Sequence, residues 1–294
     1  MQVSMHNWMR AEPIETTIRR LAEYGYNSIE ISGEPEKYDT QDVRKLLKDH
    51  SLSCWGSVTL MLGDRDLLAK NEGQRAASVQ YVNDCITMVK ELEGEEITIV
   101  PSTVGKIKAE GDPEEEWLWA VESLKQSYEH GQQEGVRLAL EPLNRFETYF
   151  LNRHDQALLL AEAVGPDCGV CLDAFHINIE ESDPYQAILN TGDRLFDFHV
   201  ADNNRMAPGQ GSWDWQKLIG TVKQTGYDGA LTVEFVAPID RTPANPYKNA
   251  LESGEVELTA EELKFIEDHG SSTLSDEYYG WLVEESIKTV RKYI

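Results

Sequence analysis

The feature that most constrains the fold is a regular alternation between short apolar runs and amphipathic stretches along almost the whole chain. The runs have the length and the content of aliphatic and aromatic residues that are typical of buried strands, and the stretches have apolar residues at helical spacing. The expected strands cover residues 1–8, 26–32, 53–61, 95–102, 136–143, 168–176, 195–202 and 229–236. The expected helices cover residues 13–25, 41–50, 73–92, 113–134, 154–164, 183–189, 214–225 and 275–294. This alternation predicts parallel βαβ units.

The number of repeats favours closure of the sheet into a (β/α)₈ TIM barrel of the α/β class. A length of 294 residues suits one barrel, which typically takes about 250 residues or more, so we expect a single domain over 1–294. The alternative is an open doubly wound sheet, which would have a glycine-rich phosphate turn after its first strand. Residues 6–13, HNWMRAEP, contain no glycine.

Residues 237–274 interrupt the alternation between the last strand and the last helix. They contain three prolines and one short helical pattern, at 259–270. An insertion after a barrel strand lies on the catalytic face, so we interpret it as a lid or an oligomer contact. The alternative is that this insertion is a surface loop without a functional role.

The composition limits the partners. The chain has 52 acidic and 27 basic side chains, a net charge of -25, which repels nucleic acid; a salt-adapted source remains open. No apolar run approaches the roughly 20 residues of a membrane helix, and the N-terminus lacks the pattern of a signal peptide. We therefore expect a soluble, cytoplasmic protein that binds neither nucleic acid nor membranes.

One cysteine pair has the spacing of a zinc or redox motif, Cys168 and Cys171. No second CxxC exists, and the segment is expected to be a strand. Residues three apart in a strand lie about 10 Å apart, too far for a disulfide. Small buried thiols are the better interpretation.

Four consecutive expected strands each end near a side chain that can bind a metal: Glu141, Asp173, His199 and Glu234. The carboxyl ends of barrel strands meet at one rim, where the active sites of such enzymes lie. Three carboxylates and one imidazole favour Mn²⁺, with Mg²⁺ or Co²⁺ possible, over a thiolate-rich zinc site. The sequence therefore predicts one divalent metal ion at the mouth of the barrel.

The same segments resemble the ketose 3-epimerases of the tagatose, allulose and ribulose type, within the xylose-isomerase-like barrel superfamily. The resemblance is carried by EPLNRFE at 141–147, LDAFHINIEE at 172–181, HVADNNR at 199–205, PGQG at 208–211 and VE at 233–234. It covers the whole chain as a fold, and its specific part covers residues 136–236.

The resemblance implies that the protein is a metal-dependent isomerase that inverts C3, the carbon beside a ketose carbonyl. Glu141 and Glu234 would be the acid/base pair as well as metal ligands. One glutamate would remove a proton to give an enediolate, which the metal stabilises, and the other would return a proton to the opposite face. Relatives of this kind usually form homodimers or homotetramers, so the resemblance also implies a homo-oligomer.

The resemblance further implies that Glu147, His176 and Arg205 hold the sugar near its carbonyl end. His176 could instead brace Asp173, three residues before it, and Arg205 could form a salt bridge on an acidic rim.

Relatives distinguish their sugars largely through the first four strand ends and a lid. The first strand end here, HNWMRAEP at 6–13, does not align with a known sugar pocket, so the substrate stays undetermined. Trp8 and Trp55 could stack against a sugar, although a tryptophan in a strand more often belongs to the core.

Three other functions compete with the epimerase. A related lyase or deglycosidase would abstract the C2 proton of a 3-keto-glycoside and eliminate its aglycone. An apurinic endonuclease would need three metals, more histidines and a basic face, and the net charge of -25 argues against it. A catalytically silent sugar-binding barrel would not need both Glu141 and Glu234.

Overall fold

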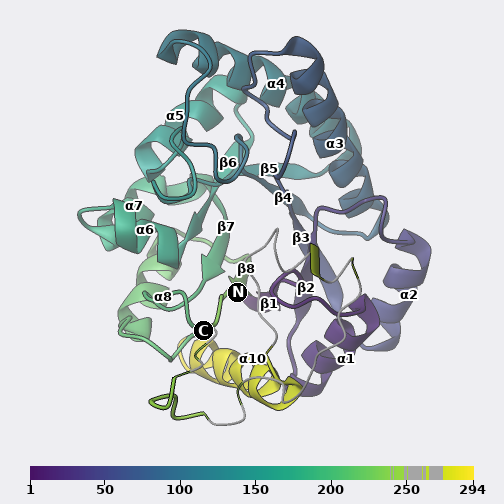
Figure 1. Cartoon of the computed structure of the whole chain (residues 1–294), viewed down its shortest axis with the longest axis vertical. Coiled ribbons are helices and arrows are strands. Elements are labelled where there is room, and N and C mark those ends of the chain that lie inside the picture. Colours follow the sequence, from purple (N-terminus) through teal and green to yellow (C-terminus); the bar gives the residue numbers. More distant parts are fainter. Residues whose placement is uncertain (239, 241, 248–249, 251–259, 261–262, 265–273) are drawn as a thin grey trace.

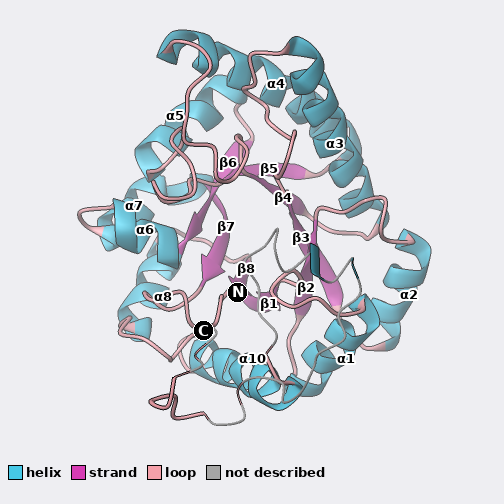
Figure 2. Ribbon diagram, in the orientation of Figure 1, coloured by secondary structure: helices cyan, strands magenta, loops and turns pink. Residues whose placement is uncertain are grey.

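The protein is a barrel of eight strands surrounded by helices (Figures 1 and 2), as seen in a computed structural model. The structure describes residues 1–294 except 239, 241, 248–249, 251–259, 261–262 and 265–273. The strands are β1 (Gln2–Met5), β2 (Ser28–Ser32), β3 (Ser53–Val58), β4 (Glu96–Ile99), β5 (Arg137–Leu140), β6 (Cys168–Asp173), β7 (Leu195–Val200) and β8 (Ala230–Val233). The α-helices are α1 (Ile14–Tyr24), α2 (Thr40–Asp49), α3 (Glu72–Glu91), α4 (Pro113–Glu134), α5 (His154–Val164), α6 (Ala174–Glu180), α7 (Pro184–Thr191), α8 (Trp215–Gln224) and α10 (Asp276–Arg291).

The sheet has the strand order β1-β8-β7-β6-β5-β4-β3-β2, and all of its neighbouring strands are parallel. A single parallel bridge between His6 and Glu30 joins β1 to β2 across the remaining seam. The predicted (β/α)₈ barrel is confirmed, and the open sheet is excluded.

Local sequence signals fix the ends of the helices. Asp112 caps α4 by accepting hydrogen bonds from two backbone amides, and Gly135 ends that helix with a left-handed φ of 73°. Gly165 after α5 has an extended φ of 178° instead. A Cβ at this position would lie 2.5 Å from the ring of Tyr128, so Gly165 supplies space rather than a left-handed turn.

The sixth strand is shorter than predicted. It ends at Asp173, and residues 174–180 form the short helix α6 rather than the end of a strand. The Asp173 carboxylate accepts a hydrogen bond from Phe175 N at 2.7 Å, which is the capping interaction that starts a helix. An apolar run this short does not reveal from periodicity alone whether it is helical. His176 therefore lies on a helix that faces the barrel mouth.

The predicted insertion over 237–274 lies largely outside the described residues, as does its helical pattern at 259–270. Its role as a lid or oligomer contact stays a prediction. None of the helices in the described part of the chain combines the length and apolar character needed to cross a bilayer. All four cysteines are buried and unpaired, as predicted.

Candidate active site

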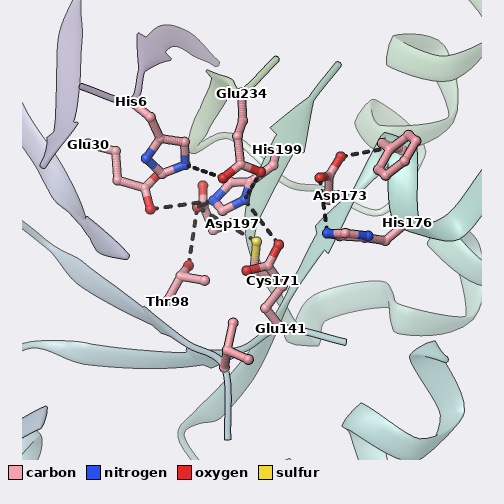
Figure 3. Close-up of polar contacts among 12 residues, drawn as sticks. His6, Glu30, Thr98, Glu141, Cys171, Asp173, His176, Asp197, His199 and Glu234 are labelled. Carbon is pink, nitrogen blue, oxygen red and sulfur yellow. Dashed lines mark hydrogen bonds and ion pairs between the residues drawn. The ribbon is translucent and has the colours of Figure 1, made fainter. Parts of the chain in front are cut away.

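The four predicted metal ligands lie at adjacent strand ends on one side of the barrel mouth. Asp173 ends β6 and His199 lies in β7, while Glu141 and Glu234 directly follow β5 and β8. All four are buried, with at most 5% of the residue exposed. Figure 3 shows their side chains directed toward a common region.

His199 joins the two glutamates. Its Nδ1 atom lies 3.3 Å from Glu141 Oε1 and 3.4 Å from Glu234 Oε2. Glu141 also belongs to a second group, with Asp173 and His176, whose ligand atoms lie within 4.8 Å of one another. Glu141 is grouped in the same way with Cys171 and His199, and Glu234 with His6 and His199, so the predicted ligands belong to groups that overlap at Glu141 and His199.

Four buried polar atoms of these residues have no hydrogen-bond partner among the described residues: Glu141 Oε1, Asp173 Oδ2 and both ring nitrogens of His199. Buried polar atoms are nearly always paired, so unpaired ones that converge on one region require an explanation. Carboxylate oxygens and an imidazole nitrogen are ligands of divalent cations. The residues present therefore fit a bound divalent metal ion.

The charges in the site support the same fit. Burial raises the pKa of the Asp173 carboxyl well above its usual range, and Glu234 and Glu141 raise it further. Burial also raises the pKa of Glu141, although His199 opposes the shift. Burial works against ionisation of Glu234 as well, but the opposing effect of His199 is the largest among those that hold its pKa well below the usual range. A cation among these carboxyls would allow all three to ionise.

The other nitrogen of His199 is fixed from inside the barrel. His199 Nε2 lies 2.9 Å from Asp197 Oδ2, and Asp197 in turn accepts a hydrogen bond from Trp55 Nε1 at 2.9 Å. The Asp197 carboxylate thus faces one ring nitrogen of His199, and the other nitrogen, Nδ1, faces Glu141 and Glu234. The sequence interpretation missed Asp197. Its signal was a charged residue two positions before His199, which places both side chains on the same face of β7.

Two further carboxyls lie near Asp197 inside the barrel, Glu30 and Glu96, both fully buried. Burial, followed by the Asp197 charge, raises the pKa of Glu30 to about 8. The same causes raise the pKa of Glu96 well above its usual range. Both carboxyls are therefore shifted toward the neutral form, while the pKa of Asp197 is lowered, against its burial, by His199 and by the hydrogen bond from Trp55. Asp197 is thus the ionised partner of His199.

Two residues from the first strand region contact Glu234. Trp8 Nε1 donates a hydrogen bond to Glu234 Oε1 at 3.0 Å, and the Trp8 side chain also lines the central cavity. His6 Nε2 lies 3.6 Å from the same oxygen. Burial lowers the pKa of His6 to about 4, so this ring is neutral. Sequence reasoning assigned no role to His6. Trp55 lies deeper in the barrel, against Asp197, and lines a separate hollow.

The predicted sugar-binding residues lie beside the predicted metal ligands. Arg205 Nη1 donates a hydrogen bond to Glu147 Oε1. His176 Nε2 lies 3.6 Å from Asp173 Oδ2, while its Nδ1 atom accepts a hydrogen bond from Asn144 N at 3.2 Å. Burial and then Arg205 lower the pKa of His176 to about 4. Arg205 thus forms the salt bridge with Glu147, His176 lies near Asp173 without a hydrogen bond to it, and His176, Arg205 and Glu147 all line the cavity.

The backbone holds Arg205 in an uncommon conformation, with a left-handed φ of 63°. Arg205 N donates to Asp202 O, and Val236 N donates to Arg205 O, both at 2.8 Å. The Asp202 carboxylate also accepts hydrogen bonds from Gly209 N at 2.9 Å and Trp215 Nε1 at 3.2 Å. The Asp202 side chain thus organises the loop that presents Arg205.

One cavity of about 370 Å³ is lined by several of the side chains described above. Its polar lining consists mainly of Glu141, Glu147, His176, Arg205 and Glu234, with Trp8 beside Glu234. This size is within the range of small-molecule sites, and ionisable groups converge on one part of it.

Comparison with known proteins finds similar chains that are named as ketose 3-epimerases. An L-ribulose 3-epimerase of Mesorhizobium japonicum is 28% identical over 223 residues, which cover 75% of this chain and 75% of that protein. A ketose 3-epimerase of Arthrobacter globiformis is 28% identical over 266 residues, 88% of this chain and 91% of that protein. A crystal structure of D-psicose 3-epimerase in the presence of D-fructose shares the fold, with a TM-score of 0.82 at 20% identity over 100% of this chain and 99% of that chain. A profile of the xylose isomerase-like TIM barrel family matches residues 18–269, and the chain therefore belongs to that family.

Proposed function

We propose that the protein is a metal-dependent isomerase that epimerises a ketose at C3. The observation that carries the proposal is the placement of Glu141 and Glu234, which line one cavity and face His199 Nδ1 at 3.3 and 3.4 Å. Two carboxylates at one cavity can serve two faces of a substrate. The relatives named as ribulose and ketose 3-epimerases support the same assignment.

Glu141, Asp173, His199 and Glu234 would hold the metal, with Mn²⁺ preferred by this ligand set and Mg²⁺ or Co²⁺ as substitutes. When bound, a divalent cation supplies Lewis-acid stabilisation of negative charge on substrate oxygens, worth several kcal/mol.

The protein groups carry the proton. One of Glu141 and Glu234 takes the proton from the carbon beside the ketone, and the other delivers a proton to the opposite face, which inverts that carbon. Arg205 donates hydrogen bonds to sugar oxygens and is kept charged: burial opposes its charge, but Glu147 and Glu234 outweigh this effect and raise its pKa. His176 and Glu147 orient the same end of the sugar.

The test is product analysis with the Mn²⁺-, Mg²⁺- and Co²⁺-loaded protein and a panel of ketoses. We expect the C3 epimer, and we expect Glu141→Gln and Glu234→Gln each to lower kcat by about 10²-fold or more. Glu122→Gln, an exposed residue of α4, is the matched control and should leave the rate unchanged. Near-normal turnover in both site variants would rule out the two-glutamate mechanism.

We also propose that the protein works in the cytoplasm as a homodimer or homotetramer. Light scattering on the purified protein tests the subunit count, and a monomeric mass would contradict it.

A further inference from the structure

The central cavity has two chemically different sides. The ionisable groups described above all lie on the side formed by the ends of β5 to β8. The opposite side, formed by the chain after β3 and β4, is lined by Val58, Leu60, Met61, Leu62, Val100 and Val104. Among the described lining residues of that side, Thr59 is the only one with a side-chain hydrogen-bonding group.

Several polar groups of this apolar wall already have hydrogen-bond partners. The Thr59 hydroxyl accepts a hydrogen bond from Val100 N at 3.1 Å. Leu60 N donates to Tyr81 Oη at 2.8 Å, and Leu60 O accepts from Arg65 Nη1 at 2.9 Å. Met61 O accepts from Val104 N at 2.8 Å. Of the side chains of this wall, only the Thr59 hydroxyl retains a proton that it can donate to the cavity, and the other six side chains are apolar.

The consequence for an ordinary ketose is unfavourable. A sugar whose carbonyl end meets Arg205 and Glu147 would direct the rest of its carbon chain toward the wall of Leu60 and Met61. Each hydroxyl buried there without a partner costs about 1–3 kcal/mol. An apolar group in the same place would instead gain about 25 cal/mol for each Å² removed from water.

We propose that the natural substrate is a keto sugar that carries an apolar group, a deoxy methyl end or an alkyl or aryl aglycone, at the end remote from the reacting carbonyl. This inference rests on the proposed function for the chemistry at the polar side of the cavity. It adds the substrate class that this function leaves open, because the apolar wall selects the far end of the molecule.

The experiment compares two matched pairs of substrates with the Mn²⁺-loaded protein in D₂O. One pair is a ketohexose and its 6-deoxy counterpart, and the other is 3-keto-glucose and its nitrophenyl glycoside. We expect the apolar member of at least one pair to have a kcat/KM at least about 10-fold higher, the scale that one group in an apolar pocket provides. A preference in the first pair identifies a deoxy sugar. A preference in the second identifies a glycoside, and release of nitrophenol would show elimination.

The failure of this inference differs from failure of the proposed function. Deuterium uptake with an equal or higher kcat/KM for the hydroxyl-bearing member of both pairs would overturn the inference alone. Absence of deuterium uptake with all four compounds would overturn both.

Two isosteric variants test the wall itself. Val58→Thr and Val100→Thr each place a hydroxyl on the apolar wall, so each should lower the preference for the apolar member by about 10-fold. Val222→Thr makes the same change at a buried position in α8 away from the cavity and should leave the preference unchanged. An unchanged preference in both folded wall variants would contradict the assignment of the wall.

Discussion

At the scale of single residues, the site depends on how His199 divides its two ring nitrogens. Nε2 faces the Asp197 carboxylate at 2.9 Å, and Nδ1 faces the two glutamates. A carboxylate on one nitrogen fixes the tautomer and the orientation of the ring, and it makes the other nitrogen a better metal ligand. We therefore predict that Asp197 positions His199 for the proposed metal, although Asp197 does not line the cavity.

Replacement of Asp197 tests this role. Asp197→Asn should weaken Mn²⁺ binding by about 10- to 100-fold, because an amide can donate to Nε2 and reverse the tautomer. Titration calorimetry measures the affinity, and excess Mn²⁺ should restore most of kcat. Asp193→Asn, an exposed change near the start of β7, is the control. An unaltered affinity in Asp197→Asn would remove the positioning role.

The Glu147–Arg205 pair predicts a dependence of stability on pH. Burial opposes ionisation of Glu147, but Arg205 and His176 outweigh it and lower its pKa below 4.5. A lowered folded-state pKa stabilises the protein above the unfolded value, and this contribution is lost as pH falls through the folded value. Glu147→Gln should therefore lower the free energy of unfolding by about 2 kcal/mol at pH 7. Urea denaturation should show this difference shrinking below pH 4.5, and a constant difference down to pH 3 would contradict the assignment.

The sequence predicted the residues at the mouth better than those beneath it. Glu141 and Glu234 are recognisable because each follows an apolar strand at the catalytic face. Asp197 and Glu30 lie within strands. The sequence does not indicate which residue will pair with a charged side chain inside a strand. Their partners come from other strands and are determined only when the barrel closes.

At the scale of elements, the strand–helix alternation identified every strand, and the errors lie at element ends. The sixth strand was extended through 176 because the apolar run continues into α6. The side chain of Asp173 determines that boundary, since it caps the helix at 2.7 Å. The capping interaction decides between strand and helix over only a few residues. The periodicity of apolar residues cannot locate a boundary that short.

A glycine in β3 makes an element-scale prediction. A Cβ on Gly56 would lie 2.3 Å from both Glu96 O and Glu96 Oε1, so strand pairing leaves no space for a side chain there. Gly56→Ala should therefore lower the free energy of unfolding by about 1–3 kcal/mol in urea denaturation.

Gly220→Ala in α8 is the matched control, because nothing lies within 4 Å of its Cβ position. This change should be neutral or stabilise the protein by up to about 1 kcal/mol. Equal effects of the two substitutions would show that β3 and β4 do not approach as described.

At the scale of the whole molecule, the barrel concentrates buried carboxyls around one axis, inside a chain whose net charge is -25. Glu30, Glu96 and Asp197 are buried within β2, β4 and β7, and the three carboxyls of the mouth are buried at or just after the ends of β5, β6 and β8. Bringing like charges together in a buried space costs free energy unless protons or a cation compensate them. The stability of the folded barrel should therefore increase when the metal binds.

This linkage predicts the effect of metal on thermal unfolding. Mn²⁺ at 100 times its dissociation constant should stabilise the folded protein by about 2.7 kcal/mol, which corresponds to a rise in Tm of roughly 4 °C for a chain of 294 residues. Differential scanning calorimetry with Mn²⁺ and with a chelator measures the shift. The Asp173→Asn variant should lose most of the shift, and an equal shift in that variant would place the metal elsewhere.

The most direct test of the central claim is anomalous diffraction at the manganese edge from crystals of the Mn²⁺-loaded protein. We expect one strong peak at the barrel mouth, with ligand atoms of Glu141, Asp173, His199 and Glu234 all within roughly 2.5 Å of it. A peak at any other group of residues, or no peak in Mn²⁺-saturated crystals, would contradict the assignment.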